Sequence, residues 1–200
     1  MGRTTSLTLS ADEVASKRLS PASLAAGVAS LREHGFVLIE NAVPLPLLRR
    51  VAHRMQTDTP TMLQLAHEMH GRAPHVYTYG NLQQDPPFTL AECCGEEILA
   101  NPWAIEIASE ASDGAPRLAP HYTGNTNLPG SRTQPVHRDS SHRVDPLTRF
   151  VVNICPCDTT LVNGAIELWP GTHIESEVER DEREARYNGD GAQWGGEFPR

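Results

Sequence analysis

The chain has 200 residues, a formal net charge of −8 and a sequence pI near 5.5. This length predicts a single domain with a substantial core. The acidic balance and the absence of a dense Lys/Arg cluster argue against nucleic acid and anionic membranes as partners and favour small molecules. No apolar run approaches the roughly 18 residues of a membrane span, and the N-terminus lacks the apolar core of a signal peptide. We therefore expect a soluble, intracellular, cytoplasmic protein whose oligomeric state is open.

The first residues, 1–19, are polar and small, and we expect most of them to form a tail, although Ser10 and Glu13 match a capping box. The remaining chain, 20–200, is expected to form one domain. Within it, Ser20-Pro21 resembles an N-cap followed by proline at the first helical position, which predicts a helix over 21–34.

Gly35 is expected to end this helix, and the apolar run 36–39 after it predicts a buried strand. A second helix is predicted from Pro44-Leu45-Pro46 to about Gln56, and a short one over 62–69. Residues 96–110 predict another helix, interrupted at Asn101-Pro102. The histidines of this part of the chain share no acidic partner and are assigned to surface or packing roles: His67, His70 and His75.

The pattern changes after Pro116. Short segments rich in β-branched and apolar residues alternate with Pro, Gly, Asn and Asp: 118–122, 133–137, 149–155 and 165–169. This predicts an antiparallel sandwich or jelly roll, so the fold is expected to be mainly β with N-terminal helices (α+β), and 116–174 is its core. The final part, 175–200, begins with a charged run, interpreted as a solvated helix or excursion without chemistry, and ends in loop.

Four cysteines occur as Cys93-Cys94 and Cys155-Pro156-Cys157, which fits neither a disulfide framework nor a CxxC zinc site. We expect reduced and mostly buried thiols. A metal site that combines Cys155 and Cys157 with His173 lacks a fourth partner at a usual spacing.

The segment Gln134-Pro-Val-His137-Arg138-Asp139 carries the functional hypothesis. Side chains two apart on a strand project from the same face, so His137 and Asp139 could hold one metal ion together. They would form two-thirds of the 2-His-1-carboxylate triad that binds Fe(II). The structural alternative places Asp139 in a turn and His137 in packing or solvent.

Three stretches in order form a more specific pattern: Gly35-Phe-Val-Leu-Ile-Glu-Asn-Ala42, Gln134-x-x-His137-x-Asp139, and Asn163-Gly-Ala-Ile-Glu-Leu-Trp-Pro-Gly-Thr-His173. Together they resemble the phytanoyl-CoA dioxygenase family over roughly residues 20–174. The resemblance implies a double-stranded β-helix (jelly roll, cupin-like) with early helices against it. It also implies Fe(II) and the cosubstrate 2-oxoglutarate, with O2 and a small-molecule substrate.

Carried over by position, the resemblance makes His137 and Asp139 the first two iron ligands. It places Gln134 and Asn153 where family members often contact 2-oxoglutarate. The turn at Pro170–His173 is expected to support the barrel mouth, with a positive φ at Gly171 and a structural or substrate-adjacent role for His173.

No histidine follows His173, and no downstream arginine suits the distal carboxylate of 2-oxoglutarate. We therefore expect the last barrel strands to be missing, because the sequence is truncated or because the protein has lost catalysis. The leading hypothesis is a dioxygenase that hydroxylates or desaturates a small organic metabolite in secondary metabolism, since retention of Asp139 disfavours halogenation. The alternatives are a catalytically incomplete relative that binds a ligand or partner, and a different jelly-roll enzyme with His137, Asp139 and His173 as metal ligands.

Overall fold

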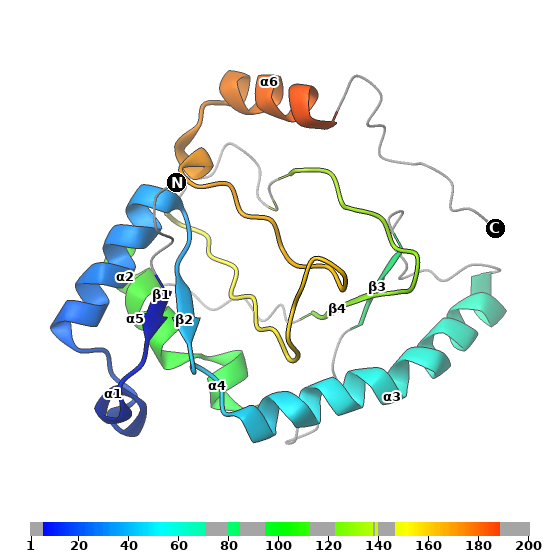
Figure 1. The fold of residues 1–200 in the computed structure, drawn as a ribbon, viewed down its shortest axis with the longest axis horizontal. Coiled ribbons are helices and arrows are strands. Elements are labelled where there is room, and N and C mark those ends of the chain that lie inside the picture. The colour runs from blue at the N-terminus through cyan, green and yellow to red at the C-terminus, as the bar shows by residue number, and fades with distance from the viewer. Residues whose placement is uncertain are drawn as a thin grey trace.

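The computed structural model describes residues 6–70, 80–84, 95–112, 123–137, 139 and 147–188. In the view of Figure 1, α2 and α5 lie on one side of the molecule, α3 along a second and α6 along a third, with coil between them. The elements in chain order are β1 (Ser6–Thr8), α1 (Ala11–Ser16), α2 (Pro21–His34), β2 (Leu38–Glu40), α3 (Leu45–His70), β3 (Asn81–Gln83), α4 (Glu96–Leu99), α5 (Pro102–Ala111), β4 (Asn125–Asn127), a 3-10 turn (Thr172–Ile174) and α6 (Glu177–Asn188).

The first elements correct the prediction of an N-terminal tail, which is wrong for residues 6–19. β1 pairs in parallel with β2, with Leu7 opposite Ile39. Ser10 and Glu13 form the capping box of α1. Leu7, Leu9 and Leu19 are all buried. A strand of three residues offers too few positions for its alternation to stand out in a polar sequence.

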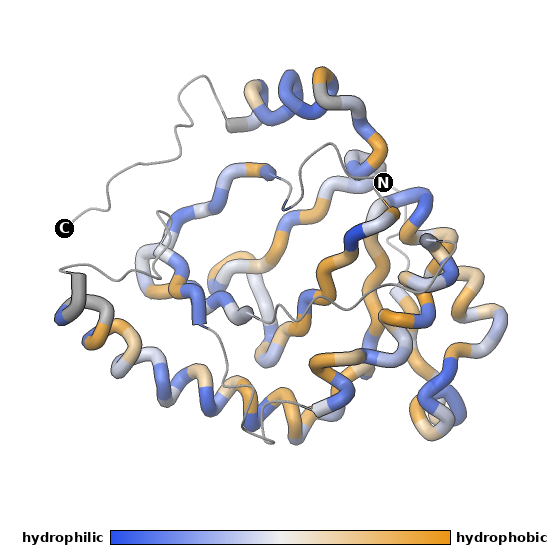
Figure 2. The backbone as a smooth tube through the Cα atoms, turned by 180° about the vertical axis from the view of Figure 1, so that it is seen from behind, coloured by the Kyte–Doolittle hydropathy of each residue, from blue (hydrophilic) through white to orange (hydrophobic). Residues whose placement is uncertain are grey.

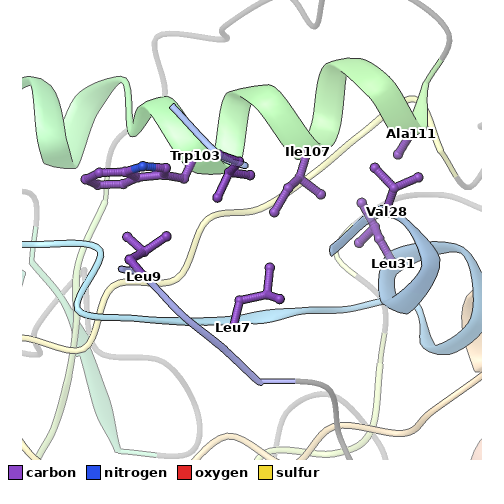
Figure 3. Packing of buried hydrophobic residues seen from close by; sticks show 8 residues of the cluster. Leu7, Leu9, Val28, Leu31, Trp103, Ile107 and Ala111 are labelled. Atoms are coloured by element: carbon purple, nitrogen blue, oxygen red, sulfur yellow. The ribbon is translucent and has the colours of Figure 1, made fainter. Parts of the chain in front are cut away.

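The main core lies where α2 and α5 meet β1 (Figure 3). Its buried residues are Leu7, Leu9, Leu19, Val28, Leu31, Trp103, Ile107 and Ala111. Gly27 lets the two helices approach, because a Cβ there would lie 2.7 Å from Cδ1 of Ile107. Each fully buried large apolar side chain contributes about 1.5–3 kcal/mol. This core therefore fixes the N-terminal layer of the molecule.

Two helix boundaries confirm the sequence signals. The Ser20 hydroxyl accepts the Ser23 amide at the start of α2, and Gly35 ends α2 at a φ of 83°. Between α4 and α5, Asn101 caps the second helix by accepting the Ala104 amide. Proline at the first position of each helix loses no intrahelical hydrogen bond there.

Helix α3 is longer than predicted, because the two helices expected in this region are one helix with Pro60 inside it. Proline has no N–H for the preceding turn and normally breaks or kinks a helix. Here the Met55 carbonyl accepts from the Thr59 hydroxyl at 2.7 Å and from the Gln84 amide at 2.6 Å. These side chains bind the backbone beside the proline, a tertiary effect that sequence periodicity does not show.

Strand pairing in the second half is sparser than predicted. β3 and β4 form an antiparallel pair with Leu82 opposite Thr126. The segments 133–137, 149–155 and 165–169 form no ladder in the described part of the chain, so the prediction of paired strands is not met there. β-branched residues favour an extended backbone, but a strand also needs a neighbour to pair with. The predicted strand 118–122 lies outside the described residues.

The charged run forms α6, a solvated helix as expected. Figure 2 shows it as mainly hydrophilic. It is nevertheless held in place: Arg183 lies 5.1 Å from the centre of the Trp169 ring and pairs with Glu175, and Tyr187 meets Trp169 edge-on. Among the described residues, no helix combines the length and apolar content of a membrane span.

Candidate metal centre

The segment that carries His137 begins at β4. After Asn127, the Leu128 amide bonds to the Gly80 carbonyl, and the Ser131 amide returns to the Leu128 carbonyl. Gly130 has a φ of 83°, which suits the tight turn at this point. The chain then runs irregularly to His137. The paired strands therefore fix the start of the segment.

The His137 imidazole is oriented by its own backbone neighbourhood. Its Nδ1 lies 2.7 Å from the Pro135 carbonyl oxygen. A carbonyl only accepts, so Nδ1 carries the hydrogen and the lone pair of the neutral ring is on Nε2. This arrangement is typical of metal-binding histidines, in which the second ring nitrogen holds the ring in position.

Nε2 of His137 faces Asp139, with 3.3 Å between Nε2 and Oδ1. The prediction that these residues lie on a strand is wrong, but the two side chains do lie close together. That they hold one metal ion stays a prediction. Two adjacent ligand atoms at about 2.0–2.2 Å from a metal are separated by roughly 3 Å. The donor types and their spacing fit a shared divalent ion.

Both groups are reachable from solvent. The Asp139 side chain is 71% exposed and that of His137 is 26% exposed. The remaining positions around such an ion are open to small ligands.

A third protein ligand is not found in the described part of the chain, where no group of three His, Cys, Asp or Glu side chains is arranged to hold a metal. The neighbours Arg138 and His142, and the earlier His75, lie outside the described residues. The two predicted cosubstrate contacts, Gln134 and Asn153, both have exposed side chains. Their roles stay predictions.

The turn at Pro170–His173 has a structural role. Gly171 has a φ of 78°, as predicted, and its amide donates to the His34 carbonyl at 3.0 Å. His173 Nε2 donates to the Arg32 carbonyl at 3.2 Å, which satisfies a carbonyl at the C-terminal end of α2. His137, Asp139 and His173 are all described residues, and they are not grouped so that they could hold one ion, so the hypothesis that His173 completes a metal site with them is not supported.

The Asn163-Gly164 turn gives a structural reason for the start of the Asn163–His173 motif, for which the sequence alone suggested none. The Asn163 side chain accepts from the Thr160 amide and donates to the Asp158 carbonyl, which closes the turn on itself. Gly164 has a φ of 95° and lies against Asn127, whose amide donates to the Asn163 carbonyl at 3.1 Å. The turn is thereby joined to β4, the strand that leads to His137.

A histidine and a carboxylate that meet in this way form part of the ligand set of mononuclear non-haem iron proteins. A family model described as phytanoyl-CoA dioxygenase (PhyH) matches residues 31–196. The match spans the α2 end, the His137–Asp139 pair, the Asn163–His173 stretch and α6. The chain belongs to the phytanoyl-CoA dioxygenase family, as its motifs predicted. This family has a cupin-like jelly-roll fold and is part of the Fe(II)- and 2-oxoglutarate-dependent oxygenase superfamily.

Proposed function

We propose that this protein is an Fe(II)- and 2-oxoglutarate-dependent oxygenase that hydroxylates or desaturates a small organic metabolite, in the tailoring of secondary metabolites. Family membership supports the reaction class. The observation that carries the proposal is the 3.3 Å approach of His137 Nε2 to Asp139 Oδ1, with the opposite ring nitrogen on the Pro135 carbonyl.

The residues of the chain would act by binding and orientation. His137 and Asp139 would hold the iron, and Gln134 and Asn153 would contact the cosubstrate. Iron with 2-oxoglutarate and O2 supplies the oxidising power for C–H bonds in such sites. The Asp139 carboxylate would occupy a ligand position that is otherwise open to halide, which favours hydroxylation or desaturation over halogenation.

The first test is metal binding under anaerobic conditions, measured by titration with Fe(II) and with Mn(II) as a redox-stable probe. We expect one ion per chain. His137→Ala and Asp139→Ala should each weaken metal binding by at least about 100-fold. Replacing even a residue that only orients a metal ligand typically lowers metal affinity by about 10–100-fold. His53→Ala, an exposed histidine on α3, is the matched control and should leave binding unchanged. Equal affinity in all four proteins would refute the site.

The second test separates the oxygenase from a catalytically incomplete relative that binds a ligand or partner. That alternative is favoured by the two-residue donor set in the described part of the chain. With Fe(II), 2-oxoglutarate and O2, an oxygenase releases succinate, and the His137→Ala protein does not. Binding of iron and 2-oxoglutarate without succinate release would identify the chain as the binding protein instead.

A further inference from the structure

Cys155 and Cys157 are two free cysteines on one exposed segment, separated only by Pro156. For these two residues this corrects the expectation of mostly buried thiols; Cys93 and Cys94 lie outside the described residues. Cysteine is among the residue types most often fully buried, so two exposed thiols this close together are unusual. We propose that Cys155 and Cys157 form a redox-sensitive dithiol that closes to an intrachain disulfide on reaction with a peroxide. The proposal is independent of the metal site and of the oxygenase function.

The backbone between the two cysteines favours closure. Two residues of fully extended chain span roughly 6.6–7.2 Å, close to the upper limit of the Cα separations of about 4.4–6.8 Å found in disulfides. The chain bends at Pro156 and Cys157, which shortens this span. The proline ring also fixes φ near about −65°, so part of the conformational freedom is already removed.

The two ends of the segment are anchored on either side of the thiols. Ile154 packs against the second core cluster, formed by Leu47, Val51 and Ile98. On the other side, the Asp158 carbonyl accepts from the Asn163 amide at 2.7 Å. The dithiol therefore lies in a short, exposed span of chain between two fixed points.

The chemistry balances with a hydroperoxide as the two-electron oxidant. One thiolate attacks the peroxide, the O–O bond breaks, and sulfenic acid and water (or an alcohol) form. The second thiolate attacks the sulfenic sulfur, the S–O bond breaks, and water leaves as the S–S bond forms. The two thiols lose two electrons and two protons in total. Thiol reductants reverse the reaction.

The test starts from fully reduced protein treated with one equivalent of hydrogen peroxide, followed by alkylation and peptide mass mapping. We expect free thiols to fall by two per chain and the peptide with both cysteines to lose the mass of two hydrogen atoms. The same peptide should resist alkylation until dithiothreitol is added. In each single variant, Cys155→Ser or Cys157→Ser, oxidation of the remaining thiol should instead stop at a sulfenic acid, which dimedone traps.

The control is the double change Cys93→Ser and Cys94→Ser, which should leave the bridge intact. Three results would overturn the proposal: a bridge from Cys155 or Cys157 to the other pair, a dimer linked between chains, or independent oxidation of both thiols to sulfinic acid. Serine at these exposed positions does not disturb packing, and a thermal melt of each variant checks this.

Discussion

Gln84 shows how a single buried polar side chain organises this structure. It is 2% exposed, its amide donates to the Met55 carbonyl, and its oxygen accepts from the Thr126 and Thr59 hydroxyls. A buried polar group is stabilising only when it is satisfied by hydrogen bonds, and this one is. It joins α3 to the β3–β4 pair, from which the segment that carries His137 continues.

Replacing Gln84 by leucine tests this role. Gln84→Leu leaves the half-buried Thr126 hydroxyl without its acceptor and the Met55 carbonyl without the Gln84 donor, and a buried polar group that loses its partner costs about 1–3 kcal/mol. We expect the free energy of unfolding in urea to fall by that amount. Gln83→Leu is the matched control, because the neighbouring glutamine forms its bond with Thr123 at the surface. An equal loss in both variants would contradict the role assigned to Gln84.

Glu13 is a second buried residue whose charge matters. Hydrogen bonds from the Ser10 amide, from the Ser23 hydroxyl and from Ser20 hold the pKa of its carboxyl well below the ordinary value of 4.5. A carboxyl with a lowered folded-state pKa stabilises the fold above its unfolded-state pKa. That contribution is lost as the pH falls toward the folded-state pKa.

Glu13→Gln removes this titration, so we expect the wild-type protein to lose its stability advantage over the variant in acid. The difference in melting temperature should be constant near neutral pH and should shrink as the pH falls below about 4.5. Glu33→Gln, at an exposed carboxyl on α2, is the control for general charge effects. A wild-type advantage that stays constant down to about pH 3 would rule out the titration as its source.

At the scale of elements, the Asn163-Gly164 turn and β4 act as one unit. A Cβ at Gly164 would overlap the Asn127 amide nitrogen, so the amide must rotate away and lose its bond to the Asn163 carbonyl. Gly130 has a similar positive φ of 83°, but among the described residues no heavy atom lies within 4 Å of the position that a Cβ would occupy there. Comparing alanine substitutions at the two glycines therefore distinguishes the cost of backbone strain from the cost of a steric clash.

We predict that Gly130→Ala lowers the free energy of unfolding by about 1–2 kcal/mol, the cost of a left-handed conformation. Gly164→Ala should cost about 0.5–1.5 kcal/mol more, because it also loses the Asn127 hydrogen bond. In an Asn127→Ala background the extra cost should vanish. An extra cost that persists in that background would show that Asn127 is not the neighbour that requires glycine. Chemical denaturation of each variant and of the wild-type protein measures these differences.

The elements also show which features the sequence could predict. Ser20-Pro21, Gly35 and Asn101-Pro102 act through bonds to residues three or four positions away, so local sequence is enough. Helix α3 continues through Pro60, and next to this position the Met55 carbonyl is bound by the side-chain amide of Gln84. Gln84 lies far along the chain, and the periodicity of the helix carries no sign of this contact. The prediction of paired strands after residue 133 is not met in the described part of the chain for a related reason. Strand pairing depends on partner segments that local propensity does not specify.

In the candidate site, His137 and Asp139 lie close together as their spacing predicted, although the assumed strand is absent from this described segment. Their role as iron ligands stays a prediction. The hydrogen bond from His137 Nδ1 to the Pro135 carbonyl was not predicted, because it follows from a local bend of the chain rather than from residue type. The bond from His173 to the Arg32 carbonyl was not predicted either. The end of α2 at Gly35 shows that carbonyls there need donors, but not which distant residue supplies one.

At the scale of the whole molecule, burial is uneven. The core between α2 and α5 contains Ile107 at 1% exposure, whereas Val162 in the second half is 97% exposed. Within the described part of the chain, the backbone N–H groups of 149–155 and 157 have no hydrogen-bond partner, and Pro156 has no N–H. Local opening costs little where amides are unpaired and apolar contacts are few, so stability should be concentrated in the N-terminal layer.

Hydrogen exchange followed by mass spectrometry tests this distribution. Amides of 149–157 should exchange at close to the rate of an unstructured peptide, and those of α2 and α5 should exchange slowest. Ile107→Ala should cost about 2–5 kcal/mol, which speeds exchange in both helices by at least about 30-fold if they unfold together. Val162→Ala should leave the amide exchange rates of both helices unchanged. Acceleration of α5 alone would show that the helices open separately, and slow exchange over 149–157 would show that this segment is paired in solution.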